Sequence, residues 1–442
     1  MSLQFITGGS GAGKSEYLSR LVCEESVRRP HDNFIVVVPE QYTMETQKKL
    51  VHMHSRKGIL NIDVVSFERL AYKVFEELGG GNRPVLDDTG KNLIVRRVLE
   101  KEKKKLDYFG SSIEKTGFVS ELKSVISELL QYGITPQQLG EIGENVKEKQ
   151  QLSAKLKDIR LVYEEFMAFL STNYITSEEI LDVLCGLVEK SKLIAGSEII
   201  FDGFTGFTPI QYKLMRLLLV YSKGIKISVT IDKKERPTGH EGWNNLFFMS
   251  KEMMNRLIAI CEEEGINVDD TVCVDRDINY RYEGAKDLAY LERNLFRYKG
   301  GVYTGTPENI RIYEGSNPKE ELQYIVSEIL QLTRKEGFRY RDIAVVTADL
   351  ETYGKVAANM MKQNDIPAFL DYKRSVAANP YVEMLCSALE IVEKGYPYDT
   401  MFRYLRTGLT GISRHDIDML ENYCLAVGIR GSRAWHEPWK KK

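Results

Sequence analysis

The chain has little of several things that would place it outside the ordinary globular class. Its 442 residues include only six cysteines and three tryptophans, no two cysteines form a C-x-x-C pair, and the formal net charge is −2. No apolar run approaches the roughly 18 residues of a membrane span. These shortages argue against a disulfide scaffold, a strongly basic nucleic-acid binder and a membrane protein. We expect reduced, mostly buried thiols and a cytoplasmic protein without a membrane partner.

The size and composition are those of a folded protein with several domains. The chain is 43% hydrophobic and 28% charged, as in globular proteins and unlike disordered ones. A chain of this length favours roughly two to four domains. Because the net charge of −2 is close to neutral, any contact with nucleic acid must come from local basic patches.

The most informative feature is a phosphate-binding pattern at the N-terminus. A strand-like run at residues 3–7 leads directly into a segment that fits G-x-x-x-x-G-K-[ST] without a mismatch: Gly8, Gly9, Ser10, Gly11, Ala12, Gly13, Lys14 and Ser15. The glycines let backbone N–H groups turn towards phosphate oxygens. Lys14 would reach the β- and γ-phosphates, and the Ser15 hydroxyl would bind Mg²⁺. We predict that these eight residues bind a nucleoside triphosphate; a glycine-rich turn that binds nothing is the alternative.

The residues around this pattern predict an open α/β core. Apolar runs rich in β-branched residues at 34–39 and 62–65 read as strands buried on both faces of a parallel sheet. Helices are expected at 43–51 and after Ser66, which is a good N-cap. Strands resume at 198–204 and 225–232. We assign residues 1–86 plus 193–235 to a first P-loop α/β lobe.

The rest of the chain is divided by its hydrophobic periodicity. We expect four further regions: an inserted helical domain at 87–192, a helical and loop connection at 236–305, a second α/β lobe at 306–372, and the start of a second helical insertion at 373–442. The second lobe would contain strands at 309–313, 343–347 and 366–370. The last residues carry two tryptophans and a lysine run without a closing strand, so we expect a truncated chain.

Asp202 is the strongest candidate for a second element of the nucleotide site. It follows the apolar run 199–201, where a carboxylate could hold Mg²⁺ together with Ser15. The next residue is Gly203, where a hydrolytic enzyme would place a glutamate. The alternative is that Asp202 merely ends a strand and caps a turn. We predict Ser15 and Asp202 as metal ligands, and we assign no catalytic residue.

The order of these motifs resembles the UvrD/Rep-type, superfamily 1 helicases. Their D-E-F-Q-D-x-x-x-x-Q motif is similar to residues 202–211, which keep the first Asp, the Phe and the final Gln. Residues 64–70 resemble their T-F-H-x-L segment, with Ser66 and Phe67 in place. Residues 342–348 resemble the opening strand of their second lobe, but Ala348 stands where that family has an arginine. The resemblance implies two RecA-like lobes with inserted helical domains.

The departures from that pattern resemble one family in particular, the AddB subunits of bacterial AddAB helicase–nucleases. The resemblance rests on the intact P-loop, residues 38–41, 66–71, 202–204 and 207–211, and the later 371–375 and 379–380. It spans the whole chain but only the N-terminal part of that longer family. Single tetrapeptides are weak evidence, whereas the ordered set is specific.

The resemblance implies ATP and Mg²⁺ as cofactors, an AddA-type motor subunit as partner, and DNA as substrate, both as double-strand ends and as single strands. It also implies a role in double-strand-break resection, Chi recognition and homologous recombination. The family's nuclease domain and iron–sulfur cluster are expected beyond residue 442. We predict that this chain binds MgATP and hydrolyses it very slowly, because it lacks a carboxylate beside Asp202 and an arginine at Ala348.

Two other interpretations remain open at this stage. The chain could be an independent P-loop ATPase, such as a kinase or an active helicase, or a scaffold whose P-loop binds nothing. The Asp202–Gly203 pair argues against the first, and the intact Lys14–Ser15 pair against the second. DNA-contacting residues are not selected by the sequence; Lys373–Arg374 is a modest candidate that could equally be a solvent-exposed basic pair.

Overall fold

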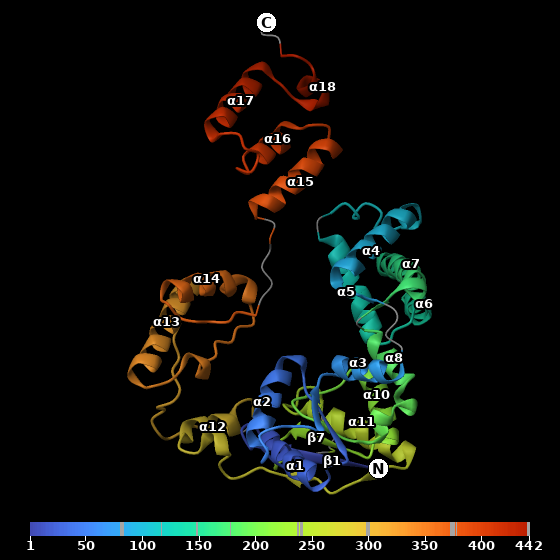
Figure 1. Ribbon diagram of the computed structural model, residues 1–442, viewed down its shortest axis with the longest axis vertical. Coiled ribbons are helices and arrows are strands. Elements are labelled where there is room, and N and C mark those ends of the chain that lie inside the picture. The colour runs from blue at the N-terminus through green and yellow to red at the C-terminus, as the bar shows by residue number, and fades with distance from the viewer. Residues whose placement is uncertain are drawn as a thin grey trace. The chain divides into compact units, whose positions relative to one another are not determined.

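The computed structural model describes residues 1–79, 84–115, 117–146, 149–176, 178–236, 238, 242–297, 301–371, 376 and 378–439. The chain divides into two compact units, residues 1–310 and 311–442, which are described separately below. The first unit contains a parallel β-sheet, labelled in part in Figure 1.

The sheet of the first unit has the strand order β3-β2-β6-β7-β1-β8, and β9 also pairs with β1. Every pairing in it is parallel. Its strands are β1 Ser2–Gly8, β2 Asn33–Val37, β3 Ile62–Val65, β6 Ser197–Phe201, β7 Gly224–Thr230, β8 Asn267–Val268 and β9 Val272–Cys273. The five longer strands confirm the predicted α/β core. The two short edge strands, β8 and β9, were not predicted.

The long strands form where the sequence carries continuous apolar runs, because both faces of this sheet are covered by helices. Phe5, Val37, Ile199 and Phe201 face one core cluster, whereas Ile6, Val36 and Ile200 face the other. Since the strands are parallel, their carboxyl ends meet at one edge of the sheet. Ligands of open α/β sheets bind at such an edge.

The helices of the first unit lie between and after these strands. They are α1 Lys14–Arg28, α2 Thr43–Met53, α3 Phe67–Leu78, α4 Asp88–Glu102, α5 Phe118–Gln131, α6 Pro136–Asn145, α7 Gln150–Asn173, α8 Ile180–Cys185, α9 Lys192–Ala195, α10 Pro209–Tyr221, α11 Phe248–Glu264 and α12 Lys286–Asn294. Several begin at the predicted kinds of cap. The Ser66 hydroxyl accepts a hydrogen bond from Arg69 N at the start of α3.

Helices α4 to α7 share a hydrophobic core that is separate from the two clusters of the sheet. Val95, Leu99, Val162 and Phe166 are its most buried members. A short parallel pair, β4 Val85–Leu86 with β5 Ile175–Thr176, joins the start and the end of this region. The sequence predicted no strand at 175–176, because two residues are too few to give a periodic signal.

The second unit contains six helices in its described residues: α13 Pro318–Lys335, α14 Leu350–Gln363, α15 Pro380–Glu393, α16 Tyr398–Leu405, α17 Arg414–Val427 and α18 Gly431–His436. Helices α13 and α14 pack through Leu322, Val326 and Met360. Helices α16 and α17 pack through Phe402 and Cys424.

The strands expected at 309–313, 343–347 and 366–370 are not formed in the described residues of the second unit. Ile312, Val346 and Phe369 are each more than 90% exposed. A strand is stabilised by a hydrogen-bonded neighbour and by burial of one face. These segments pair with no described strand, and they bury only single residues such as Ile366. A second α/β lobe at 306–372 therefore stays a prediction.

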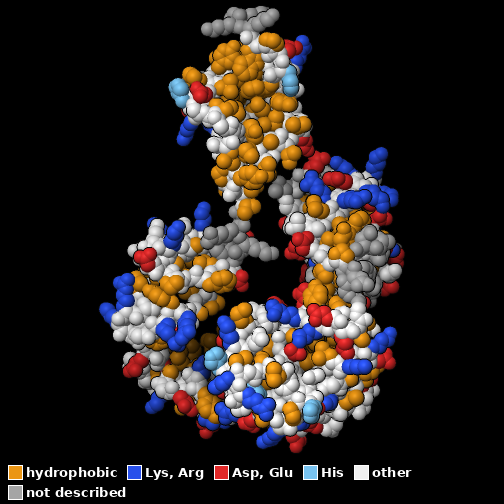
Figure 2. Space-filling view, viewed as in Figure 1, with side chains coloured by type: hydrophobic (Ala, Val, Ile, Leu, Met, Phe, Trp, Pro, Cys, Tyr) orange, Lys and Arg blue, Asp and Glu red, His pale blue; other side chains and the backbone are white. Residues whose placement is uncertain are grey.

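Apolar side chains are also exposed on the helices at the end of the chain, where Figure 2 shows a broad hydrophobic surface. Leu389 and Val392 of α15 are 74% and 71% exposed, and Met419 and Leu425 of α17 are each 54% exposed. Among the helices that the structure describes, none is both long enough and apolar enough to cross a membrane.

Candidate nucleotide-binding site

The predicted P-loop lies between β1 and α1, at the carboxyl edge of the sheet. Gly11 and Gly13 adopt φ angles of 70° and 95°, a region that glycine enters without steric cost. Tyr17 N donates to Gly13 O at 2.8 Å, which closes the first turn of α1. Within the described part of the chain, no hydrogen bond is made by the backbone amides of Gly11, Gly13, Lys14 and Ser15. These amides sit at the N-terminus of a 15-residue helix and can receive an anion.

Lys14 points back along this loop. Its Nζ donates to Gly8 O at 2.8 Å and to Gly9 O at 2.9 Å. Burial lowers the pKa of Lys14, and the nearby carboxylates of Asp202 and Asp275 oppose that shift. The ammonium group is thus half-desolvated and held by two neutral carbonyls, which a phosphate oxygen would replace with a stronger, charge-assisted contact.

Asp202 follows β6 and is near enough to Lys14 to influence its pKa. One oxygen, Oδ1, accepts a 2.5 Å hydrogen bond from the Ser228 hydroxyl, which also accepts one from Gly203 N at 3.3 Å. Gly203 has a φ of 84°, in the left-handed region that disfavours other residues. A Cβ at this position would lie 3.4 Å from Pro39 Cδ. The backbone therefore disfavours a glutamate at the position where a hydrolytic enzyme would carry one.

The described residues contain no cluster of three or more His, Cys, Asp or Glu side chains that could hold a metal ion. Mg²⁺ in nucleotide sites usually takes only one or two protein ligands, with phosphates and waters as the rest. The Asp202 Oδ2 atom and the Ser15 hydroxyl have no hydrogen-bond partner within the described ranges, so both are available. Their chemistry fits a shared ligand role with nucleotide phosphates.

The structure brings a segment to the P-loop that the sequence did not single out, residues 274–282, which we call the strap. Val274 N donates to Thr7 O at 2.9 Å, extending the pairing of β9 with β1. Four further contacts follow: Gly9 N to Asp275 Oδ1 at 2.7 Å, Asn279 Nδ2 to Ser10 O at 3.2 Å, Arg281 N to Gly11 O at 3.3 Å, and Tyr282 Oη to Ser10 Oγ at 3.3 Å.

Two side chains of the strap lie where they could contact a nucleotide. A Cβ placed on Gly11 would be 2.6 Å from Arg281 Cβ, and one placed on Gly13 would be 3.4 Å from the Tyr280 ring. The Arg276 guanidinium stacks on that ring at 3.4 Å from its centroid. Arg281 forms no salt bridge with any described residue, and it is close enough to lower the pKa of Lys14. Only the fold selects these residues from the chain's many tyrosines and arginines.

The segments that carry the helicase resemblance also meet at this edge of the sheet. The Phe67 ring lies 5.7 Å from Phe201, 5.4 Å from Phe204 and 6.0 Å from Phe207. The aromatic cluster holds the loop after Asp202 against the start of α3. Gln211 Oε1 accepts from Thr208 N at 2.9 Å, so its side chain caps α10 and serves the local fold.

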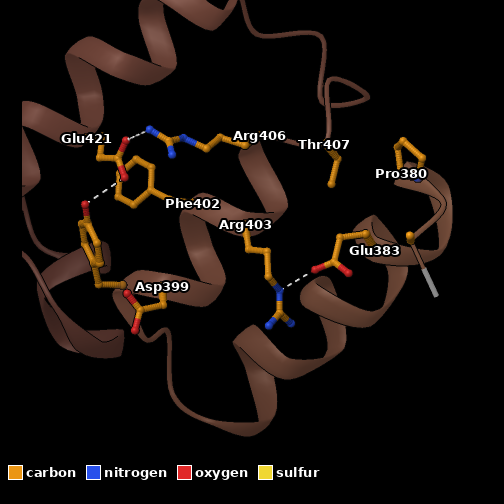
Figure 3. A pocket seen from close by; sticks show the side chains of 10 residues that line it. Pro380, Glu383, Asp399, Phe402, Arg403, Arg406, Thr407 and Glu421 are labelled. Carbon is orange, nitrogen blue, oxygen red and sulfur yellow. Dashed lines mark hydrogen bonds and ion pairs between the residues drawn. The ribbon is translucent and has the colours of Figure 1, made fainter. Parts of the chain in front are cut away.

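A separate pocket lies in the second unit. It has a volume of about 520 Å³ and is lined by residues of α15, α16 and α17. Figure 3 shows two ion pairs in it: Arg403 pairs with Glu383 at 2.5 Å, and Arg406 pairs with Glu421. Tyr398 Oη donates to Glu421 at 2.9 Å. Because these charges are already neutralised, the pocket is a weaker candidate site than the P-loop.

The remaining predicted positions belong to the second unit or fall outside the described residues. Ala348 belongs to the second unit, in an irregular segment before α14. Lys373 and Arg374 fall outside the described residues. All six cysteines are free thiols, and four of them are buried.

Known proteins are similar to this sequence over its full length. Residues 5–292 match the family described as "ADDB, N-terminal". The B subunit of an ATP-dependent helicase/deoxyribonuclease from Lachnoclostridium phytofermentans is 42% identical over 445 residues, which cover 100% of this chain and 39% of that protein. Proteins of the same name from Clostridium novyi and Caldanaerobacter subterraneus are 34% and 37% identical, each covering 100% of this chain and 38% of the relative. The chain therefore spans about two fifths of the length of the curated relatives it matches.

Proposed function

Because the chain belongs to the AddB family, we propose that it is the nucleotide-binding, non-motor part of a helicase/deoxyribonuclease B subunit. It binds MgATP at residues 8–15, and Ser15 and Asp202 share the Mg²⁺. The complex acts in the cytoplasm on DNA double-strand ends and single strands, beside an AddA-type motor subunit, in resection and recombination repair.

The observation that carries this proposal is the combination of an open P-loop with a glycine at the position after Asp202. Free amides, Lys14 and the N-terminus of α1 favour phosphate binding. Because residue 203 is a glycine, no carboxylate stands there to activate water, and its positive φ disfavours a residue that would carry one. Phosphate charge would be neutralised by Mg²⁺, but without a base the hydrolysis step lacks a group commonly worth several powers of ten in rate.

Arg281 and Tyr280 complete the site in this proposal. The helicases that this chain resembles have an arginine where this chain has Ala348. Arg281 instead lies against Gly11, and it has no salt-bridge partner among the described residues. We assign its guanidinium to the phosphates and the Tyr280 face to the base. ATP then contacts both the P-loop and the strap.

The proposal is tested by calorimetric binding of MgATP to the 442-residue chain and by steady-state turnover, with and without single-stranded DNA. Lys14→Ala should weaken binding at least about 100-fold, because a half-buried charge at the phosphates is lost. Arg20→Ala, on the exposed face of the same helix, is the matched control.

Each outcome separates the candidate functions. Binding that Lys14→Ala abolishes, with negligible turnover, is the expected result. Brisk turnover stimulated by DNA would favour an independent active P-loop ATPase. Absence of nucleotide binding by the unaltered chain would favour a scaffold whose P-loop has no ligand.

A further inference from the structure

Two carboxylates line the end of the P-loop to which Lys14 points. A Cβ placed on Gly9 would lie 3.0 Å from Glu292 Oε1 and 3.2 Å from Asp275 Oδ1. Asp275 follows β9 and Glu292 lies on α12, so both reach the loop from beyond the sheet edge. Both are close enough to Lys14 to raise its pKa.

Neither carboxylate forms an ion pair with a residue that the structure describes. Asp275 accepts from two backbone amides, Gly9 N at 2.7 Å and Lys233 N at 2.9 Å. Across the described residues, no Lys or Arg nitrogen lies within salt-bridge distance of Asp275 or Glu292. Burial raises the pKa of Glu292, and the Asp232 and Asp275 carboxylates add to that effect, while the Ser10 amide and the more distant Arg293 charge oppose it. Glu292 therefore sits in an environment that already disfavours negative charge.

The terminal phosphate of a nucleotide would meet this same environment. A P-loop lysine reaches the β- and γ-phosphates, and the Lys14 Nζ atom lies on the Gly8 and Gly9 carbonyls, beside the two acids. Around Lys14, three carboxylates (Asp202, Asp275 and Glu292) face one further cation, Arg281. The Asp202 charge would be offset by Mg²⁺, but Asp275 and Glu292 stay opposite the γ-phosphate. The two carboxylates and a γ-phosphate all carry negative charge, and like charges repel strongly in a half-buried site.

We infer that Asp275 and Glu292 are specificity-determining residues that make the site prefer a nucleoside diphosphate to a triphosphate. The inference rests on the proposed nucleotide-binding function. A diphosphate fills the free amides of Gly11, Gly13, Lys14 and Ser15 and leaves the Asp275–Gly9 hydrogen bond intact. A triphosphate must approach both acids, so its binding works against the contact that holds the strap to the P-loop.

The test is calorimetric titration of the chain with MgADP and with the poorly hydrolysed analogue MgATPγS. The unaltered chain should bind MgADP about tenfold more tightly, the factor that 1.4 kcal/mol of repulsion produces. Asp275→Asn and Glu292→Gln remove charge and keep shape. Each should reduce the ratio of MgADP affinity to MgATPγS affinity about threefold or more, and the double variant should remove the preference for MgADP. Asp277→Asn is the matched control, because Asp277 lies on the strap but is 96% exposed and pairs with Lys233.

An unchanged ratio in the double variant, with both nucleotides still bound, would overturn the inference and leave the proposed function standing. Absence of binding for both nucleotides would overturn the inference and the proposed function together. If Asp275→Asn fails to fold, Glu292→Gln decides alone, since Glu292 does not bridge the loop to residue 233.

Discussion

The Asp275 carboxylate accepts a 2.7 Å hydrogen bond from the backbone amide of Gly9, across 266 positions of sequence. This contact joins the strap to Gly9 of the P-loop. It exists because β9 pairs with β1, so the chain leaves β9 beside the turn at which β1 ends. Nucleotide binding and the position of the strap are therefore expected to depend on each other.

Arg281→Ala is expected to weaken MgATP binding by about tenfold and AMP binding much less. The reason is that the Arg281 guanidinium, which has no salt-bridge partner among the described residues, would make a charge-assisted contact with bound phosphates. Competitive displacement of a fluorescent ATP analogue measures both affinities. Arg256→Ala on α11 is the control, because Arg256 pairs with Glu252 on its own helix. Equal loss for ATP and AMP would place Arg281 away from the phosphates.

Gly203→Glu is expected to leave ATP turnover negligible and to lower stability by about 1–3 kcal/mol, the usual cost of a non-glycine residue at positive φ. Thermal unfolding and phosphate release measure the two effects. Gly206→Ala is the control, because Gly206 lacks a positive φ and an added Cβ would meet only the flexible end of Met249 at 3.4 Å. Restored turnover with unchanged stability would contradict this account of Gly203.

Gly11→Ala is expected to destabilise the chain more than Gly117→Ala does, by about 1–2 kcal/mol. Both glycines have positive φ, so both substitutions carry backbone strain. Only the Cβ at residue 11 meets another group, 2.6 Å from Arg281 Cβ, whereas the one at residue 117 meets nothing within 4 Å. Urea unfolding of the two variants gives the difference. Equal destabilisation would mean that the strap does not pack on the loop.

The ionisation of Asp287 is expected to make the stability of the fold depend on pH. Its carboxylate accepts hydrogen bonds from Asn309 N at 2.7 Å and Glu308 N at 2.9 Å, and fixes the start of α12. The Asn309 amide chiefly lowers the pKa of Asp287 to about 2, from 3.8. A carboxylate with a depressed pKa stabilises the fold above its unfolded pKa and loses that contribution as the pH falls through the folded value.

The stabilising effect of Asp287 should therefore be complete above about pH 4 and disappear towards pH 2. Asp287→Asn should be less stable than the unaltered chain at pH 7, and the gap should close between these values. Urea unfolding at pH 7, 4 and 2.5 measures it, with the exposed Asp270→Asn as control. A gap that stays constant with pH would show that ionisation of Asp287 does not contribute.

The glycine-rich turn at residues 8–15 and the five long strands around it could be predicted from local sequence alone. Residues 8–15 form their turn because glycines permit the positive φ angles there, and residues 34–37 and 199–201 form buried strands because they are continuously apolar. These are local properties of the chain. The same kind of apolar signal at 343–347 gives no strand in the structure, because a strand also needs a neighbour that the sequence pattern does not supply.

The groups that stand opposite the P-loop depend instead on how distant segments pair. Asp275, Tyr280, Arg281 and Glu292 lie in a stretch that reads as polar, with helices and loops, and no motif marks them. They reach residues 9–13 because β8 and β9 complete the far edge of β1, and strand order is set by long-range hydrogen-bond ladders. Closing such a large loop is compensated by burial of the whole sheet, which no short window of sequence can report.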